Sequence, residues 1–152
     1  MELRLELNGT QRCEQIDPRM LLVEALRDGF RTTGPKIGCL TGDCGACTVR
    51  LDGRVVKSCL RLAVACDGAQ VRTLEGLDDE GELTALQQAF WDEHAFQCGY
   101  CLSGMLFAAE ELLGRMPAPS DAEIREALSA NLCRCTGYDP IVRAVRRAAS
   151  AP

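Results

Sequence analysis

The sequence is organised around one loop, Gly38-Cys39-Leu40-Thr41-Gly42-Asp43-Cys44-Gly45-Ala46-Cys47, in which three thiols have the spacing C-x4-C-x2-C. A hydrophobic core does not call for cysteines set between glycines. On such a loop the thiols can point at one shared centre, and the glycines let backbone N–H groups approach its sulfurs. Followed by a later fourth cysteine, this is the spacing of plant-type [2Fe–2S] sites, which we prefer to disulfides or a zinc site.

The composition narrows the class of protein. The chain has 152 residues, 47% of them apolar, which is enough for a sizeable core in one domain or in two small ones. Its net charge of −5 and the lack of a long basic run argue against a nucleic-acid partner. The first six residues, Met1-Glu2-Leu3-Arg4-Leu5-Glu6, lack the pattern of a signal peptide, and no apolar stretch approaches the roughly 20 residues of a membrane span. We therefore expect a cytoplasmic protein.

The ten cysteines favour metal or redox chemistry. Thiols stay reduced in the cytoplasm, so that a cysteine-rich chain there forms metal sites more often than disulfides. Eight of the cysteines form two groups of four, at Cys39, Cys44, Cys47 and Cys59 and at Cys98, Cys101, Cys133 and Cys135. We expect the other two, Cys13 and Cys66, to be ordinary buried thiols, because free cysteine often behaves as a small hydrophobe.

The start of the chain predicts two strands and a helix. Leucines alternate with charged residues over residues 2–7, and Asn8-Gly9 predicts a hairpin turn into a second strand over 10–16. Asp17-Pro18 predicts a helix that starts there, with Asp17 as the N-cap, and that ends at Gly29. This order of elements is typical of a small ferredoxin-like β-grasp domain.

A second hairpin supplies the fourth cysteine of the first group. Asp52-Gly53 is a two-residue turn between two runs of strand-forming residues. Counting back from this turn, the register places Cys47 opposite Ser58. Cys59 therefore lies beside Cys47, whereas Cys66 has no such register argument.

The remaining pattern completes an α+β fold. After a strand over 69–74, residues 75–81 are rich in glycine and acidic residues and form a candidate linker. Helices are then expected over 83–94, over 99–116, from Ser120 or Asp121 onward, and from Asp139-Pro140 onward. We expect an N-terminal ferredoxin-like β-grasp domain over residues 1–76, followed by a C-terminal four-helix bundle domain over residues 77–152.

The second group of cysteines lies at the starts of predicted helices. Cys98-Gly99-Tyr100-Cys101 opens the second helix of the bundle, and Cys133-Arg134-Cys135 lies just before the last one. Free N–H groups and the positive end of the helix dipole favour thiolates at such places. Each motif can thus offer a thiolate pair to one shared site. The C-x-C spacing is tight for one zinc ion but suits two thiolates on one iron of a wider cluster, so zinc stays open as the less favoured alternative.

The chain carries four longer motifs around these cysteines. They are Gly38-Cys39 through Gly45-Ala46-Cys47-Thr48-Val49, Ser58-Cys59-Leu60, Gln97-Cys98-Gly99-Tyr100-Cys101, and Asn131-Leu132-Cys133-Arg134-Cys135-Thr136-Gly137-Tyr138. Together they resemble the small iron–sulfur subunit of the molybdenum hydroxylases, the family of xanthine dehydrogenase, aldehyde oxidoreductase, carbon monoxide dehydrogenase and several N-heterocycle hydroxylases. The resemblance covers nearly the whole chain.

This resemblance implies an enzyme subunit that carries electrons. In the family a large subunit holds molybdenum on a pterin cofactor and oxidises the substrate, and the small subunit removes the electrons one at a time through two [2Fe–2S] clusters. The resemblance implies a cluster proximal to the pterin on Cys98, Cys101, Cys133 and Cys135, and a distal cluster on Cys39, Cys44, Cys47 and Cys59. In many relatives the acceptor beyond the distal cluster is FAD on a medium subunit. Gln97 and Cys135 match family positions that touch the pterin.

Two positions depart from the pattern of the relatives, and two other functions compete with that of an enzyme subunit. Leu102-Ser103 stands where relatives often have Thr-Pro, and Ala130 stands where many have Gly, which leaves the substrate undetermined. The alternative functions are a stand-alone ferredoxin-like electron carrier and a zinc-stabilised interaction module. Gln97 has little to do in a free carrier, and it therefore favours the enzyme subunit. We expect Trp91 to pack in the core or in an interface, and Tyr100 to serve in packing.

Overall fold

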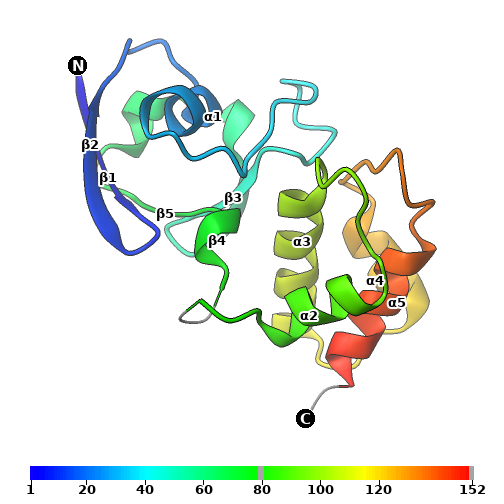
Figure 1. The fold of residues 1–152 in the computed structure, drawn as a ribbon. Helices are drawn as coiled ribbons and strands as arrows, with labels where there is room; N and C mark the ends of the chain where they lie inside the picture. The colour runs from blue at the N-terminus through cyan, green and yellow to red at the C-terminus, as the bar shows by residue number, and fades with distance from the viewer. Residues whose placement is uncertain (79–80, 151–152) are drawn as a thin grey trace.

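A mixed five-stranded sheet forms the N-terminal half of the molecule. The structure is a computed structural model that describes residues 1–78 and 81–150 (Figure 1). The strands are β1 (Glu2–Leu7), β2 (Thr10–Gln15), β3 (Thr48–Leu51), β4 (Arg54–Lys57) and β5 (Gln70–Arg72), and their order in the sheet is β2-β1-β5-β3-β4. β1 and β5 run parallel, whereas the other neighbours are antiparallel. Both predicted hairpins and the later strand are confirmed.

The core of this half lies between the sheet and a short helical segment. The three leucines of β1 are almost fully buried, as the alternating pattern predicts. The helix α1 (Leu22–Glu24) continues into the π-helix η1 (Ala25–Gly29), in which the Phe30 N–H donates to the Ala25 carbonyl at 2.9 Å. The helix ends at Gly29, as predicted.

The predicted start of this helix at Asp17 is wrong. Asp17 accepts the Arg19 N–H at 2.9 Å in a turn, and the chain then stays extended as far as Leu21. The reason is a long-range pairing: Leu22 N–H donates to the Arg61 carbonyl at 2.7 Å, and Leu21 forms a bridge to Leu62. Backbone that pairs with a distant segment cannot also form the first turn of a helix.

The expectation of a buried thiol holds for Cys66 but is wrong for Cys13. Cys66 is buried in the core of the N-terminal half. Cys13 is exposed because it lies on β2, an edge strand whose residues are nearly all exposed.

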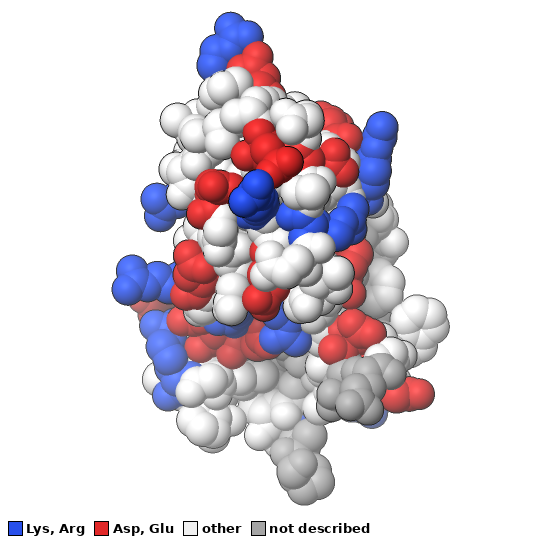
Figure 2. Space-filling model, turned by 90° about the vertical axis from the view of Figure 1, so that its left-hand side faces the viewer, with Lys and Arg blue, Asp and Glu red and all other residues white. Residues whose placement is uncertain are grey.

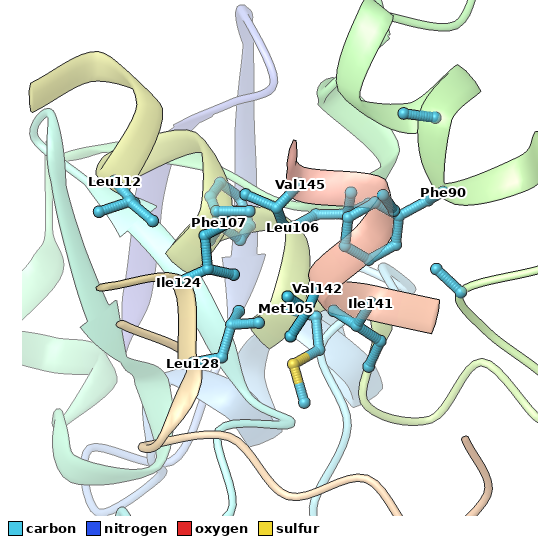
Figure 3. Close-up of a cluster of buried hydrophobic side chains, with 14 of the residues drawn as sticks. Phe90, Met105, Leu106, Phe107, Leu112, Ile124, Leu128, Ile141, Val142 and Val145 are labelled. Atoms are coloured by element: carbon cyan, nitrogen blue, oxygen red, sulfur yellow. The ribbon is translucent and has the colours of Figure 1, made fainter. Parts of the chain in front are cut away.

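Four helices form the C-terminal half: α2 (Ala85–Asp92), α3 (Leu102–Arg115), α4 (Asp121–Leu128) and α5 (Asp139–Ala149). Their apolar faces meet in a second core, which Figure 3 shows around Phe107, Ile124 and Val145. Ser120 caps α4 with a capping box, which confirms the helix start predicted there, and Thr84, which was not predicted as a cap, caps α2 in the same way. The helix predicted from residue 99 begins only after Cys101, which is its N-cap.

The predicted linker begins as ordered structure. Leu74–Gly76 form a 3-10 helix, and the Glu75 carboxylate accepts the Gly34 N–H at 2.6 Å. Leu77 is buried in the core of the helical half. Residues 79 and 80 of the predicted linker lie outside the described residues.

Polar contacts join the two halves. Arg50 of β3 forms ion pairs with Glu110 at 2.8 Å and with Glu111 at 3.4 Å on α3. The Ser103 hydroxyl donates to the Thr48 carbonyl at 2.7 Å, and both of these residues are buried. On the face drawn in Figure 2, basic and acidic side chains are intermixed rather than separated into patches.

Gly104, at the start of α3, should not tolerate alanine. A Cβ atom there would overlap the Gly45 carbonyl oxygen and Oδ1 of Asn131. We expect Gly104→Ala to lower the free energy of unfolding by about 1–3 kcal/mol, the usual cost of overpacking, in urea denaturation. Gly114→Ala in the same helix is the matched control, because a Cβ atom there meets open space. The higher helix propensity of alanine should raise the free energy of unfolding of this variant by up to about 1 kcal/mol. Equal stabilities of the two variants would contradict the close contact at Gly104.

Candidate metal centres

The first group of cysteines gathers where the loop meets the β3–β4 hairpin. Cys47 directly precedes β3, and Cys59 lies in the 3-10 helix Ser58–Leu60 that follows β4. The backbone N–H and the hydroxyl of Ser58 both donate to the Cys47 carbonyl, at 3.3 and 2.6 Å. Cys47 and Cys59 are buried side by side. The register derived from Asp52-Gly53 is therefore confirmed.

Hydrogen-bond donors surround the sulfur of Cys39. The backbone N–H groups of Thr41 and Cys44 donate to it, each at 3.4 Å. The Thr41 hydroxyl and these two N–H groups lower the pKa of Cys39 to about 6. Burial and the neighbouring Cys47 thiol raise the pKa of Cys59 to about 11. The hydrogen bonds at Cys39 thus favour its thiolate, whereas the buried Cys59 needs a nearby cation to be held as a thiolate.

The second group joins two loops of the helical half. Cys98 and Cys101 lie in the turn before α3, and Cys133 and Cys135 lie in the loop between α4 and α5. The sulfurs of Cys98 and Cys135 are 3.5 Å apart, and the Cys101 thiol forms a hydrogen bond with Cys133. Burial, followed by this contact, raises the pKa of Cys101 to about 12.

The sulfurs pair across the two motifs rather than within them. The sequence suggested that Cys133-x-Cys135 would supply two thiolates to one iron, but the closest sulfur partners are Cys98 with Cys135 and Cys101 with Cys133. The physical reason is direction, since Cys135 is exposed whereas Cys133 is turned toward the buried Cys101.

The donor set fits two bridged irons better than one ion. In the part of the chain that the structure describes, no three Cys, His, Asp or Glu side chains converge closely enough to hold a single metal ion. Each group instead provides two sulfur pairs, Cys39 with Cys44 and Cys47 with Cys59 in the first group. Two thiolates on each of two irons is the ligand set of a [2Fe–2S] cluster.

Direct contacts connect the two groups. The Leu132 N–H, next to Cys133, donates to the Cys44 carbonyl at 2.9 Å. The Tyr100 hydroxyl donates to the Ile37 carbonyl, and the Lys57 ammonium donates to the Ala130 carbonyl at 3.0 Å. Tyr100 therefore does more than pack. The sequence analysis assigned Tyr100 to packing and did not single out Lys57 or Leu132. Their position in or beside the cysteine motifs is the signal that could have drawn attention to them.

Gln97 lies at the exposed side of the second group. Its side-chain amide donates to the Cys135 carbonyl at 3.2 Å, and Gln97, Cys98 and Cys135 are all exposed. Cys101, in the same group, is buried. Nearby, Trp91 is 62% exposed and its ring centroid lies 6.0 Å from that of Phe96, which excludes a place in the core.

Comparison with known proteins identifies the family. The family described as "2Fe-2S iron-sulfur cluster binding domain" matches residues 5–85, and the family described as "[2Fe-2S] binding domain" matches residues 73–146. The nicotine 6-hydroxylase small subunit of Paenarthrobacter nicotinovorans is 50% identical over 145 residues, which are 95% of this chain and 87% of that protein. The chain belongs to the small iron–sulfur subunits of the molybdenum hydroxylases.

Other relatives of this small subunit agree. The caffeine dehydrogenase subunit gamma of Pseudomonas sp. (strain CBB1) is 46% identical, over 95% of this chain and 88% of that protein. A chain of quinoline 2-oxidoreductase from Pseudomonas putida 86 superposes with a TM-score of 0.93 at 46% identity, covering 98% of this chain and 93% of its own length. The aldehyde oxidoreductase from Desulfovibrio desulfuricans ATCC 27774 has a TM-score of 0.89 at 42% identity, but this chain spans only 17% of that longer one.

Family membership gives the broad function. The small subunit binds [2Fe–2S] clusters and transfers electrons within an oxidoreductase complex, while substrate oxidation takes place on a partner subunit. Among the described residues, no helix is both long enough and apolar enough to cross a membrane.

The register of the second hairpin predicts which cysteine completes the first group. Cys59→Ala should abolish the electron spin resonance signal of one cluster, because it removes the thiol beside Cys47. Cys66→Ala is the matched control: Cys66 is equally buried but packs in the core of the sheet, so both signals should survive. Loss of a cluster in Cys66→Ala, with both clusters intact in Cys59→Ala, would refute the assignment.

Proposed function

We propose that this small subunit takes electrons one at a time from a molybdenum–pterin site on a large subunit and passes them to FAD on a medium subunit. Each bound [2Fe–2S] cluster accepts and releases one electron. The observation that carries the proposal is the pairing of eight thiols into two groups, joined by the hydrogen bond from Leu132 N–H to the Cys44 carbonyl.

The cysteines divide between the two clusters as the sulfur pairs suggest. We assign the distal cluster to Cys39, Cys44, Cys47 and Cys59, and the proximal cluster to Cys98, Cys101, Cys133 and Cys135. With a cluster bound, each sulfur pair would ligate one iron. The distal cluster belongs to a domain of residues 1–76 and the proximal cluster to a domain of residues 77–152, in keeping with the two separate hydrophobic cores.

Gln97 and Cys135 are the residues of this chain that we place against the pterin. They lie together at the exposed side of the proximal group, and the Gln97 amide holds the Cys135 carbonyl in place. An exposed amide can donate to and accept from the edge of a pterin ring. Covering by the large subunit would exclude water from the exposed sulfurs of Cys98 and Cys135.

A path for electrons within the chain joins the two groups of cysteines. Cys133, Leu132 and Cys44 form a route of covalent bonds and one hydrogen bond, and no segment of the chain needs to move for it to exist. The Tyr100 and Lys57 contacts hold the same two loops together. In this assignment the chain itself fixes the separation of the clusters and lines the path between them.

The names of three relatives support a proposal for the substrate class. Nicotine, caffeine and quinoline, which appear in the names of three relatives, are nitrogen heteroaromatic compounds. We propose that the large subunit oxidises a compound of this class and that the complex works in the cytoplasm. A stand-alone carrier is the alternative, and the exposed Gln97 beside exposed cluster sulfurs favours the subunit.

Iron analysis and electron spin resonance test the cofactor assignment. We expect about four irons per chain and two distinct [2Fe–2S] signals in the reduced protein, since each group has four thiols. Serine substitution in one group should remove only one signal. Stoichiometric zinc, or a single signal that survives serine substitution in either group, would sink the assignment.

Gln97→Ala tests the pterin contact. Both clusters should still assemble, because all eight cysteines remain, and dithionite should reduce them at the wild-type rate. Reduction of the clusters by substrate in the purified complex should be slower, by about tenfold or more if one contact at the electron-transfer junction is lost. Gln15→Ala, on the exposed edge strand β2, is the matched control and should behave as wild type. Wild-type reduction by substrate in Gln97→Ala would show that the pterin-contact assignment is wrong.

A further inference from the structure

The loop between α4 and α5 is closed by its own hydrogen bonds. The Cys133 N–H donates to the Tyr138 hydroxyl at 3.0 Å, and the Tyr138 N–H donates to the Thr136 hydroxyl oxygen at 3.1 Å. Tyr138 has a φ of 71°, in the left-handed region that aromatic residues rarely adopt. These two bonds offset the strain, and they fix where the Thr136 hydroxyl lies.

The Thr136 hydroxyl is aimed at a cluster sulfur. Its oxygen lies 3.1 Å from Sγ of Cys133. The oxygen already accepts the Tyr138 N–H, and a thiolate that binds iron carries no proton of its own. The hydroxyl proton must therefore be donated to the Cys133 sulfur. The N–H groups of Cys135 and Thr136 point at the same sulfur, so that it lies in a nest of donors.

We propose that Thr136 sets the reduction potential of the proximal cluster by donating a hydrogen bond to the Cys133 thiolate, and that Tyr138 is the residue that positions it. This inference rests on the proposed function. Reduction adds one electron, supplied by substrate in the complex or by dithionite in a titration, and makes the site one charge more negative. A hydrogen bond to an anion strengthens with the charge on its acceptor, so the hydroxyl favours the reduced form and raises the potential.

Thr136 also lies on the side of the second group that is nearer to the first group. Cys133 pairs with the buried Cys101, on the side away from the exposed Cys98 and Cys135. It also follows Leu132, whose N–H meets the Cys44 carbonyl of the distal group. With a cluster bound, the Thr136 hydroxyl would therefore act on the cysteine that lies beside the distal group, and it would favour the added negative charge on that side of the site.

Thr136→Val is the decisive variant, because it removes the hydroxyl and keeps the shape of the side chain. The experiment is a potentiometric titration of the purified complex, with both clusters followed by electron spin resonance. We expect the midpoint potential of the proximal cluster to become more negative by about 59 mV. For a one-electron step this corresponds to a tenfold change in the equilibrium constant for reduction. The distal midpoint should not move. Thr136→Ser, which keeps a hydroxyl, should restore most of the wild-type value.

The control variants distinguish an effect of the Thr136 hydroxyl from a general loss of structure. Thr10→Val, on the exposed strand β2, should leave both midpoints unchanged. An unchanged proximal midpoint in Thr136→Val, or an equal shift in Thr136→Ser, would overturn the inference while leaving the proposed function intact. Wild-type protein that binds no [2Fe–2S] cluster would overturn the proposed function itself.

A second measurement tests for the hydrogen bond directly if Thr136→Val fails to assemble its proximal cluster. Hyperfine spectroscopy of the reduced wild-type protein in deuterated buffer should show one strongly coupled exchangeable proton on the proximal signal in addition to those of the Cys135 and Thr136 N–H groups, and this further proton is that of the hydroxyl. The same proton should persist in Thr136→Ser. Its absence from both proteins would overturn the inference.

Discussion

The close contact between the loop of residues 38–47 and the loop of residues 131–138 is the constraint on which the rest of the structure depends. Leu132 N–H reaches the Cys44 carbonyl, and the side chain of Asn131 fills the space beside Gly45 and Gly104, where a Cβ atom would not fit. A Cβ atom on Gly104 would overlap the Gly45 carbonyl, and Gly45 itself has a φ of 76°, which residues with a side chain rarely adopt. The ion pairs of Arg50 with α3 then act at the periphery of a contact that is already close-packed.

This contact brings two groups of thiolates near each other, and the chain offsets the resulting negative charge locally. Backbone N–H groups serve the sulfur of Cys39, and N–H groups with one hydroxyl serve that of Cys133. Lys57 adds a positive charge where the two loops meet, and its ammonium donates to the Ala130 carbonyl in the turn after α4. Donors fixed by backbone cost no reorganisation when the charge of a site changes by one electron, which suits repeated electron transfer.

The sequence predicts the local features of this fold well, because they follow from neighbouring residues. The Asp52-Gly53 turn fixes a register that places Cys59 beside Cys47, and Ser120 caps α4 as its motif requires. The errors arise where distant segments decide. Asp17 carries a sound helix-start signal, yet residues 20–22 pair with residues 61–63 instead. In the same way, spacing identifies the cysteines of the second group, but only the packing of two loops shows that Cys98 pairs with Cys135.

The second group of cysteines, to which we assign the proximal cluster, has an exposed side and a buried side. Cys98 and Cys135 face outward beside Gln97, whereas Cys101 is buried and Cys133 turns inward toward the loop of the distal group. An exposed pair of cluster ligands needs a partner to cover it. Water at such a pair would stabilise the reduced, more negative cluster, and solvent access would also let other reactants reach it. Cys101 needs no such cover, since the core of the helical half already buries it. The arrangement therefore suits a subunit with one entrance for electrons at the helical half and a fixed internal path toward the sheet, rather than a carrier that meets its partners in any order.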